Sequence, residues 1–69
     1  MHERIGEESA EALAWAIPWL IPGYHASCEE EGEDSVLLVE YETDTGSVRT
    51  TLRTRGEVAD FLRKALAQG

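Results

Sequence analysis

The spacing of apolar residues predicts a helix near the start of the chain. Leu13, Ile17 and Ile21 recur every four residues in a stretch rich in alanine, which is typical of a helix over residues 7–17. Pro18 has no backbone N–H to donate to the carbonyl four residues earlier. We therefore expect the helix to end or kink at Pro18.

A capping box and an apolar stripe predict a second helix over residues 55–67. Thr54 and Glu57 have the T-x-x-E spacing, in which each side chain accepts a hydrogen bond from the backbone of the other. Apolar residues then recur at helical spacing and predict one buried face, formed by Val58, Phe61, Leu62, Ala65 and Leu66.

Between the helices, the sequence predicts an acidic loop over residues 24–34 and a β-hairpin over residues 35–54. The run Val36-Leu37-Leu38-Val39 is apolar on both faces of its strand. We expect the two helices to cover opposite faces, or the hairpin to extend a sheet edge of a second copy. The predicted fold is therefore α+β, a single helix–hairpin–helix domain over residues 1–69 with an antiparallel two-stranded sheet, alone or extended by dimerisation.

Two registers of the hairpin are compatible with the sequence. The turn Thr43-Asp44-Thr45-Gly46 favours a left-handed bulge at Gly46, which pairs Glu42 with Val48. The apolar pattern instead pairs Tyr41 with Val48. A slip of one residue exchanges the two faces of a strand, so the choice decides which side chains are buried.

The net negative charge narrows the classes of partner that the chain can bind. The 69 residues contain 14 acids and 6 bases, a net charge of -8, and residues 5–48 contain no Lys or Arg. Such a surface disfavours direct binding to nucleic acid or to an anionic membrane. One cysteine allows no intrachain disulfide and fits a reducing compartment. The longest apolar run, residues 12–21, is too short to span a membrane, so we expect a cytoplasmic protein.

Two interpretations of the acidic residues remain open at this point. One is a solvated surface that favours solubility. The other is an imitation of the nucleic-acid backbone, which would occupy the basic groove of a nucleic-acid-binding protein. In that case we expect the partner-binding residues to be Glu29, Glu30, Glu31, Glu33, Asp34, Glu40, Glu42 and Asp44.

Candidate chemistry is sparse, and we expect no enzyme, metal or cofactor. His25 and Cys28 are three residues apart, a spacing that fits half of a metal site or a thiolate pair. The neighbouring glutamates should raise the pKa of the Cys28 thiol and oppose its reactivity. An ordinary histidine and an incidental thiol are therefore the favoured interpretation.

Trp15 and Trp19 are four residues apart and share a helix face if the helix continues past Pro18. We expect them to pack in the core, because indoles bury large areas. The alternative is a pair of exposed anchors for a partner's pocket.

In its size and charge the whole chain resembles the phage-encoded anti-CRISPR proteins, a group of small, often acidic inhibitors that share no motif. The resemblance implies a DNA mimic that binds a basic, DNA-reading subunit of a CRISPR surveillance complex (Cascade), with the type I-C complex as the expected target, in the cytoplasm of an infected bacterium. It implies that target DNA is kept out of the complex. The alternative is a small interaction module, such as an antitoxin or a subunit of a phage or host complex, with incidental acidity.

Overall fold

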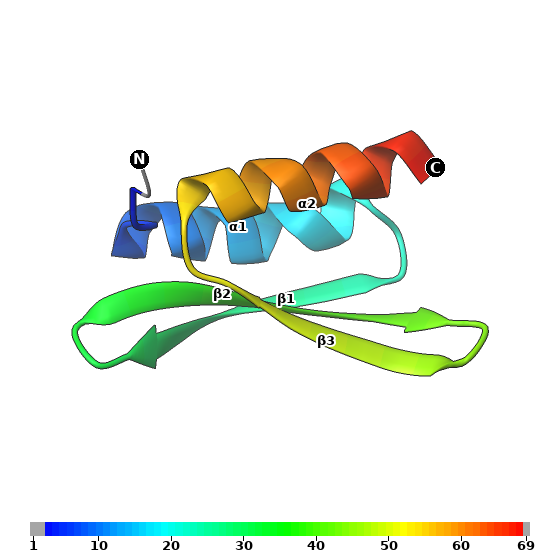
Figure 1. The fold of residues 1–69 in the computed structure, drawn as a ribbon, viewed down its shortest axis with the longest axis horizontal. Helices are drawn as coiled ribbons and strands as arrows, with labels where there is room; N and C mark the ends of the chain where they lie inside the picture. Colours follow the sequence, from blue (N-terminus) through cyan, green and yellow to red (C-terminus); the bar gives the residue numbers. More distant parts are fainter. Residues whose placement is uncertain (1–2, 69) are drawn as a thin grey trace.

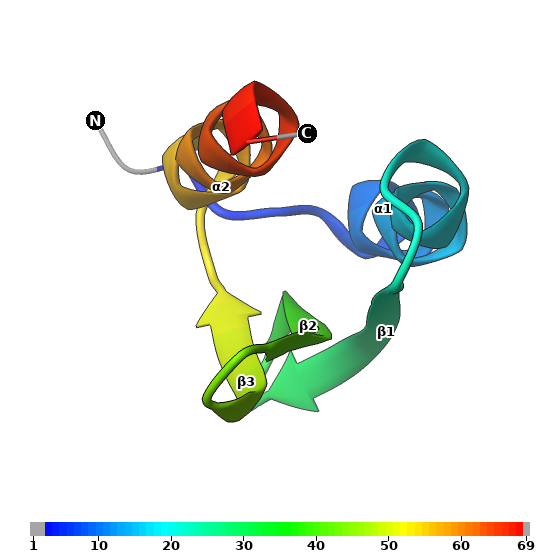
Figure 2. The same ribbon diagram turned by 90° about the vertical axis from the view of Figure 1, so that its right-hand side faces the viewer.

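Both helices lie on one face of a three-stranded antiparallel sheet in the computed structural model, which describes residues 3–68 (Figure 1; Figure 2). In chain order the elements are α1 (Glu7–Leu20), β1 (Tyr24–Glu31), β2 (Asp34–Thr43), β3 (Gly46–Leu52) and α2 (Arg55–Gln68). The α+β class agrees with the sequence, but the prediction of a two-stranded sheet is wrong. The third strand comes from the same chain and not from a second copy.

Strand β1 occupies most of the segment that was expected to be an acidic loop. Its residues alternate between the two faces of the sheet, and Tyr24, Ala26 and Cys28 pack against the core. Gly32 follows with a φ of +66° at the first of two turn positions, which is typical of a type II′ hairpin. The register that results pairs Glu31 with Asp34.

The hairpin between β2 and β3 adopts the register that the apolar pattern favours. Tyr41 pairs with Val48, and Thr43 pairs with Gly46, whose φ is +129°. The Thr43 hydroxyl stabilises the turn, because it accepts from the Thr45 N–H at 3.3 Å and donates to the Gly46 carbonyl at 3.0 Å. Gly46 thus has the expected positive φ, but the expected bulge that would pair Glu42 with Val48 is wrong, because Glu42 pairs with Ser47.

Helix α1 continues past Pro18 to Leu20. The helix was expected to end or kink at this proline, and the expectation that it ends there is wrong. Pro18 lies in the last turn, and its missing N–H leaves the Ala14 carbonyl without its helical donor. The end of the helix still closes with a backbone bond, since the Ile21 N–H donates to the Ile17 carbonyl at 2.9 Å. The chain then reverses at Pro22-Gly23, where Gly23 has a φ of +90°.

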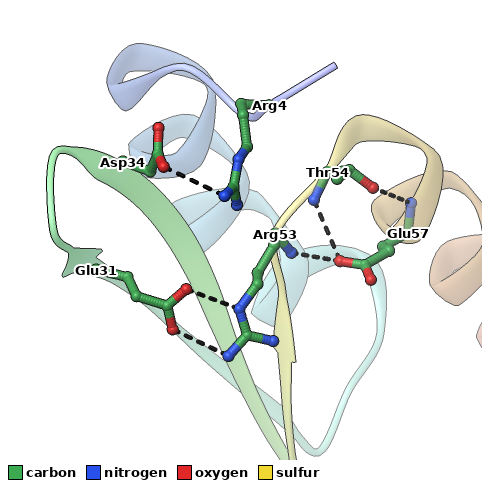
Figure 3. A network of polar contacts seen from close by, with 6 residues as sticks. All are labelled: Arg4, Glu31, Asp34, Arg53, Thr54 and Glu57. Atoms are coloured by element: carbon green, nitrogen blue, oxygen red, sulfur yellow. Dashed lines mark hydrogen bonds and ion pairs between the residues drawn. The ribbon is translucent and has the colours of Figure 1, made fainter. Parts of the chain in front are cut away.

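The predicted capping box of α2 is confirmed. The Glu57 N–H donates to the Thr54 hydroxyl, and the Thr54 N–H donates to Glu57 Oε1, both at 3.2 Å (Figure 3). The Arg53 N–H donates to the same Oε1 at 2.6 Å. The hydrogen bonds from the Arg53 and Thr54 backbone lower the pKa of the Glu57 carboxyl from its ordinary value of 4.5.

This cap makes stability depend on pH. A carboxyl whose folded pKa is lowered stabilises the fold above its ordinary pKa, and that stabilisation is lost as the pH falls through the folded pKa. We expect Glu57→Gln to reduce the loss of stability below pH 4.5, because the amide accepts hydrogen bonds without titrating. Urea unfolding over a series of pH values measures this dependence.

Glu33→Gln is the matched control for this prediction. It removes one carboxylate that has no hydrogen-bond or ion-pair partner among residues 3–68. If both variants follow the same pH dependence, the cap is not the source of it.

The core lies between the helices and the sheet. Ile17, Leu37 and Val39 are its largest fully buried side chains. Helix α1 covers β1 and β2, whereas α2 packs over β3, and the view along the helices shows both on the same side (Figure 2). The expectation that the helices cover opposite faces is therefore wrong.

On the helix-free face of the sheet, a long side chain rather than a helix covers an apolar residue. Val36 points to this face yet is only 3% exposed. The Arg53 side chain crosses β2 beside it to reach Glu31, with which it makes two hydrogen bonds (Figure 3). The methylene groups of such a long side chain can cover apolar surface while the guanidinium remains in water.

Candidate partner-binding surface

The eight acids expected to bind a partner are distributed over the length of the sheet. Glu29 to Glu31 end β1, Glu33 lies in the following turn, and Asp34 begins β2. Glu40 and Glu42 lie farther along β2, and Asp44 occupies the turn at the opposite end of the molecule (Figure 1). The structure therefore does not bring all eight into one cluster.

Three of these acids are neutralised by arginines that are distant in sequence. Glu31 receives the Arg53 guanidinium at 2.8 and 2.9 Å (Figure 3). The two remaining pairs are longer and half-exposed, Asp34 with Arg4 at 3.3 Å and Glu40 with Arg49 at 3.4 Å. The pairs of Arg53 and Arg4 join residues more than 20 positions apart and could not be seen in the charge pattern. The register that the apolar pattern favours, in contrast, places Arg49 opposite Glu40.

The pair between Glu31 and Arg53 has the strongest geometry of the three. Its two parallel N–H···O contacts are the bidentate arrangement that guanidinium and carboxylate favour. The hydrogen bond from Arg53 is the main cause that lowers the pKa of the Glu31 carboxyl. Glu31 is therefore ionised and bound within the chain, which makes it a poor contact for a partner.

A second group of acids gathers at one edge of the molecule, around Cys28. Burial raises the pKa of this thiol, and four carboxylates raise it further; in decreasing order of effect they belong to Glu11, Glu7, Glu30 and Glu29. They come from the first turns of α1 and from the end of β1, which lie at the same end of the fold (Figure 1). The rise in the thiol pKa agrees with the sequence-based expectation.

We call these four acids, together with Glu33 of the adjoining β1–β2 turn, the acidic edge, which therefore consists of Glu7, Glu11, Glu29, Glu30 and Glu33. Among residues 3–68, none of its members takes part in an ion pair. Each of the five arginines is paired with another acid, so this edge carries negative charge that the rest of the described chain does not neutralise. Glu29, Glu30 and Glu33 belong to the partner-binding residues expected from the sequence, and the helix residues Glu7 and Glu11 add their charge to the same edge.

The spacing of His25 and Cys28 does not produce a shared site. Because strand residues alternate between faces, side chains three apart point to opposite sides of the sheet. Cys28 packs against the core, whereas His25 is exposed opposite Glu40. Within residues 3–68, no three histidine, cysteine or acidic side chains are arranged to hold a metal ion.

The tryptophan pair is exposed, so the expectation of core packing is wrong. Trp15 and Trp19 are 71% and 77% exposed, and their ring centroids lie 6.1 Å apart. They share a helix face, as their spacing indicated, but it is the face opposite Ile17, which is buried. The spacing could not reveal this, because alanines in α1 leave more than one face apolar.

No family model matches this chain, and neither the curated proteins nor the solved structures contain a match. No helix within residues 3–68 has the length and apolar character needed to cross a membrane. The function must therefore be argued from the surface itself.

Proposed function

We propose that this chain is a non-catalytic inhibitor that binds a basic, nucleic-acid-binding protein and keeps nucleic acid out of its groove. The observation that supports the proposal is the acidic edge, whose five carboxylates have no basic partner among residues 3–68. The proposed target is a DNA-reading subunit of a type I-C CRISPR surveillance complex. The chain would then be a phage-encoded anti-CRISPR protein that acts in the host cytoplasm.

The scaffold of the acidic edge suits this role. In α1, Glu7 and Glu11 are one helical turn apart, roughly 6 Å. In β1, Glu29 and Glu30 are adjacent residues, so their carboxylates point to opposite faces of the sheet and place negative charge on both sides of its edge. The carboxylates stand on a helix and a strand that share a core, so little ordering is needed on binding.

Electrostatics would act mainly on the rate of association. A net charge of -8 steers the chain toward a positive groove and can raise the association rate by about 10- to 1,000-fold at low salt. Screening shortens the range of this attraction to about 8 Å at physiological ionic strength. Inhibition by this mechanism must therefore weaken as salt is added.

The proposal is tested by target-DNA binding to the purified type I-C complex, with and without this chain, at two salt concentrations. We expect inhibition that weakens sharply at the higher salt. Salt titration of DNA binding without the chain is the necessary control, because DNA itself binds less tightly at higher salt. Absence of inhibition at the lower salt would contradict the proposed target, and inhibition that does not change with salt would contradict the electrostatic mechanism.

A second candidate is a small interaction module whose acidity is incidental, such as an antitoxin or a subunit of a phage or host complex. The exposure of Trp15 and Trp19 favours it, because tryptophans often anchor interfaces. For this candidate, Trp15→Ala with Trp19→Ala would weaken partner binding more than reversal of charge on the acidic edge.

A further inference from the structure

The exposed apolar surface of the molecule is concentrated on the helices. Among residues 3–68, four large hydrophobic residues are exposed, and all lie on α1 or α2: Trp15 at 71%, Trp19 at 77%, Leu20 at 58% and Leu66 at 56%. The sheet lies on the other side of these helices and buries their inner faces (Figure 2). Trp15 and Trp19 lie on the face of α1 opposite the buried Ile17, so this face is an apolar surface without a partner among residues 3–68.

This surface is large for so short a chain. A tryptophan buries about 150 to 250 Å² when it is covered, so the exposed parts of the two indoles contribute roughly 300 Å². Patches of about 300 to 600 Å² are the largest on typical monomers and are often functional. One side of a standard protein interface measures about 800 Å², so the two indoles alone supply roughly a third of it.

The outer face of α1 carries groups that complement one another. Glu8, Ala12, Trp15 and Trp19 follow at spacings of four, three and four residues, which places them in one line along the helix. Within residues 3–68, neither indole N–H has a hydrogen-bond acceptor and Glu8 has no ion-pair partner. Ala12 is exposed and has the smallest side chain of the four. This line of residues therefore combines two large indoles with a small alanine, and it combines indole N–H donors with the carboxylate acceptor of Glu8.

We propose that this face of α1 is a self-complementary interface through which two copies of the chain associate with their α1 helices antiparallel. In that arrangement Trp15 of each copy lies against Ala12 of the other, and the indole N–H of Trp19 faces the carboxylate of Glu8. Buried indoles usually find such a hydrogen-bond acceptor. A two-fold interface requires that one patch match itself, and this one does so only in the antiparallel direction.

The charges of the helical layer favour the same direction. The two helices run in parallel, so their first turns lie at one end of the layer and their last turns at the other (Figure 1). Glu7, Glu8 and Glu11 make the first end acidic, and Lys64 lies in the second half of α2. Lys64 is the one basic residue within residues 3–68 that has no ion pair. An antiparallel copy brings the acidic end of one layer near Lys64 of the other, whereas a parallel copy would oppose acid to acid.

The interface does not depend on the proposed inhibitory function. It leaves Glu29, Glu30 and Glu33 on β1 and its turn, away from the outer face of α1, whereas Glu7 and Glu11 belong to the acidic end that it brings near Lys64. It does use the tryptophans on which the second candidate function relies.

Sedimentation equilibrium of the purified chain over a range of concentrations tests the proposal. We expect a mass that rises from one copy to two with concentration. Trp15 and Trp19 are the two tryptophans of the chain, so fluorescence reports on this face alone. On dilution their emission should shift to longer wavelength and acrylamide should quench it more strongly. Replacing both by alanine should weaken association by about a hundredfold or more.

A matched pair of charge reversals locates the interface without removing apolar surface. Glu8→Lys places a positive charge where the interface needs an acceptor, whereas Glu42→Lys makes the same change on the helix-free face of the sheet. We expect Glu8→Lys to weaken association and Glu42→Lys to leave it unchanged or strengthen it. A chain that stays monomeric at every concentration would overturn the proposal and leave the tryptophans to a foreign partner. Equal weakening by both reversals would overturn the assignment to α1.

Discussion

The double reversal Glu29→Lys with Glu30→Lys is expected to abolish inhibition of DNA binding at physiological salt. It replaces two negative charges of the acidic edge by two positive ones, so the charge of the edge falls from -5 to -1 and most of the attraction to a basic groove is removed. Loss of electrostatic steering alone lowers an association rate by about 10- to 1,000-fold. Neither side chain has a hydrogen bond or an ion pair within residues 3–68, so the free energy of unfolding should change little.

The matched control is Glu42→Lys with Asp44→Lys. It makes the same change in net charge, but at the β2–β3 end of the sheet, opposite the acidic edge (Figure 1). We expect this variant to retain most of the inhibition and to lose only what general steering by the net charge contributes. Equal losses in the two variants, measured as association rates with the complex, would show that total charge matters and that the acidic edge has no special role.

Leu37→Ala is expected to lower the free energy of unfolding by about 2 to 5 kcal/mol. Leu37 is fully buried in the central strand, between Cys28 of β1 and Leu52 of β3. Folded domains are stable by about 5 to 15 kcal/mol, and a chain of this length falls toward the low end. We therefore expect a large fraction of this variant to be unfolded at 37 °C, which circular dichroism during urea titration measures.

Leu38→Ala is the control for that prediction. Leu38 is the next residue of β2 and points to the helix-free face, where it is half-buried. We expect Leu38→Ala to lower the free energy of unfolding by less than Leu37→Ala does, because a partly exposed leucine gains less from burial. If both substitutions lower the free energy of unfolding by the same amount, both faces of β2 would be equally covered. That result would contradict the placement of both helices on one face of the sheet.

The parts of the fold that the sequence predicted correctly are those governed by local rules. The capping box at Thr54 and Glu57 needs three residues of separation and forms as expected. The apolar pattern favoured the observed pairing of Tyr41 with Val48. Leu66 is the exception in the predicted stripe of α2, because it lies at the edge of the face that meets the sheet and is 56% exposed.

Strand β1 was missed because its signal is weak. Its inward residues Ala26 and Cys28 are small, and the glutamates that follow continue on both faces of the strand. Acidic residues are also rare in strands, which favours a loop on propensity alone. The strand forms because β2 offers it a hydrogen-bonding edge and α1 covers its inner face, and both are tertiary effects.

The candidate site could be predicted only in part for a similar reason. The charge pattern identified an acidic chain, but the pairing of Glu31 with Arg53 joins residues 22 positions apart and appears only when β1 and β3 flank β2. The same fold brings Glu7 and Glu11 of α1 close enough to the end of β1 for all to act on the Cys28 thiol. The sequence supplied the charges, and the sheet order decided which of them stay unneutralised.

The central claim is that the acidic edge occupies the groove that would otherwise hold DNA. Binding of the labelled chain to the type I-C surveillance complex, free or already loaded with target DNA, tests this claim most directly. The account predicts tight binding to the free complex and little or none to the loaded complex at the same salt concentration. Equal binding to both would show that chain and DNA do not share a site, and would contradict the account.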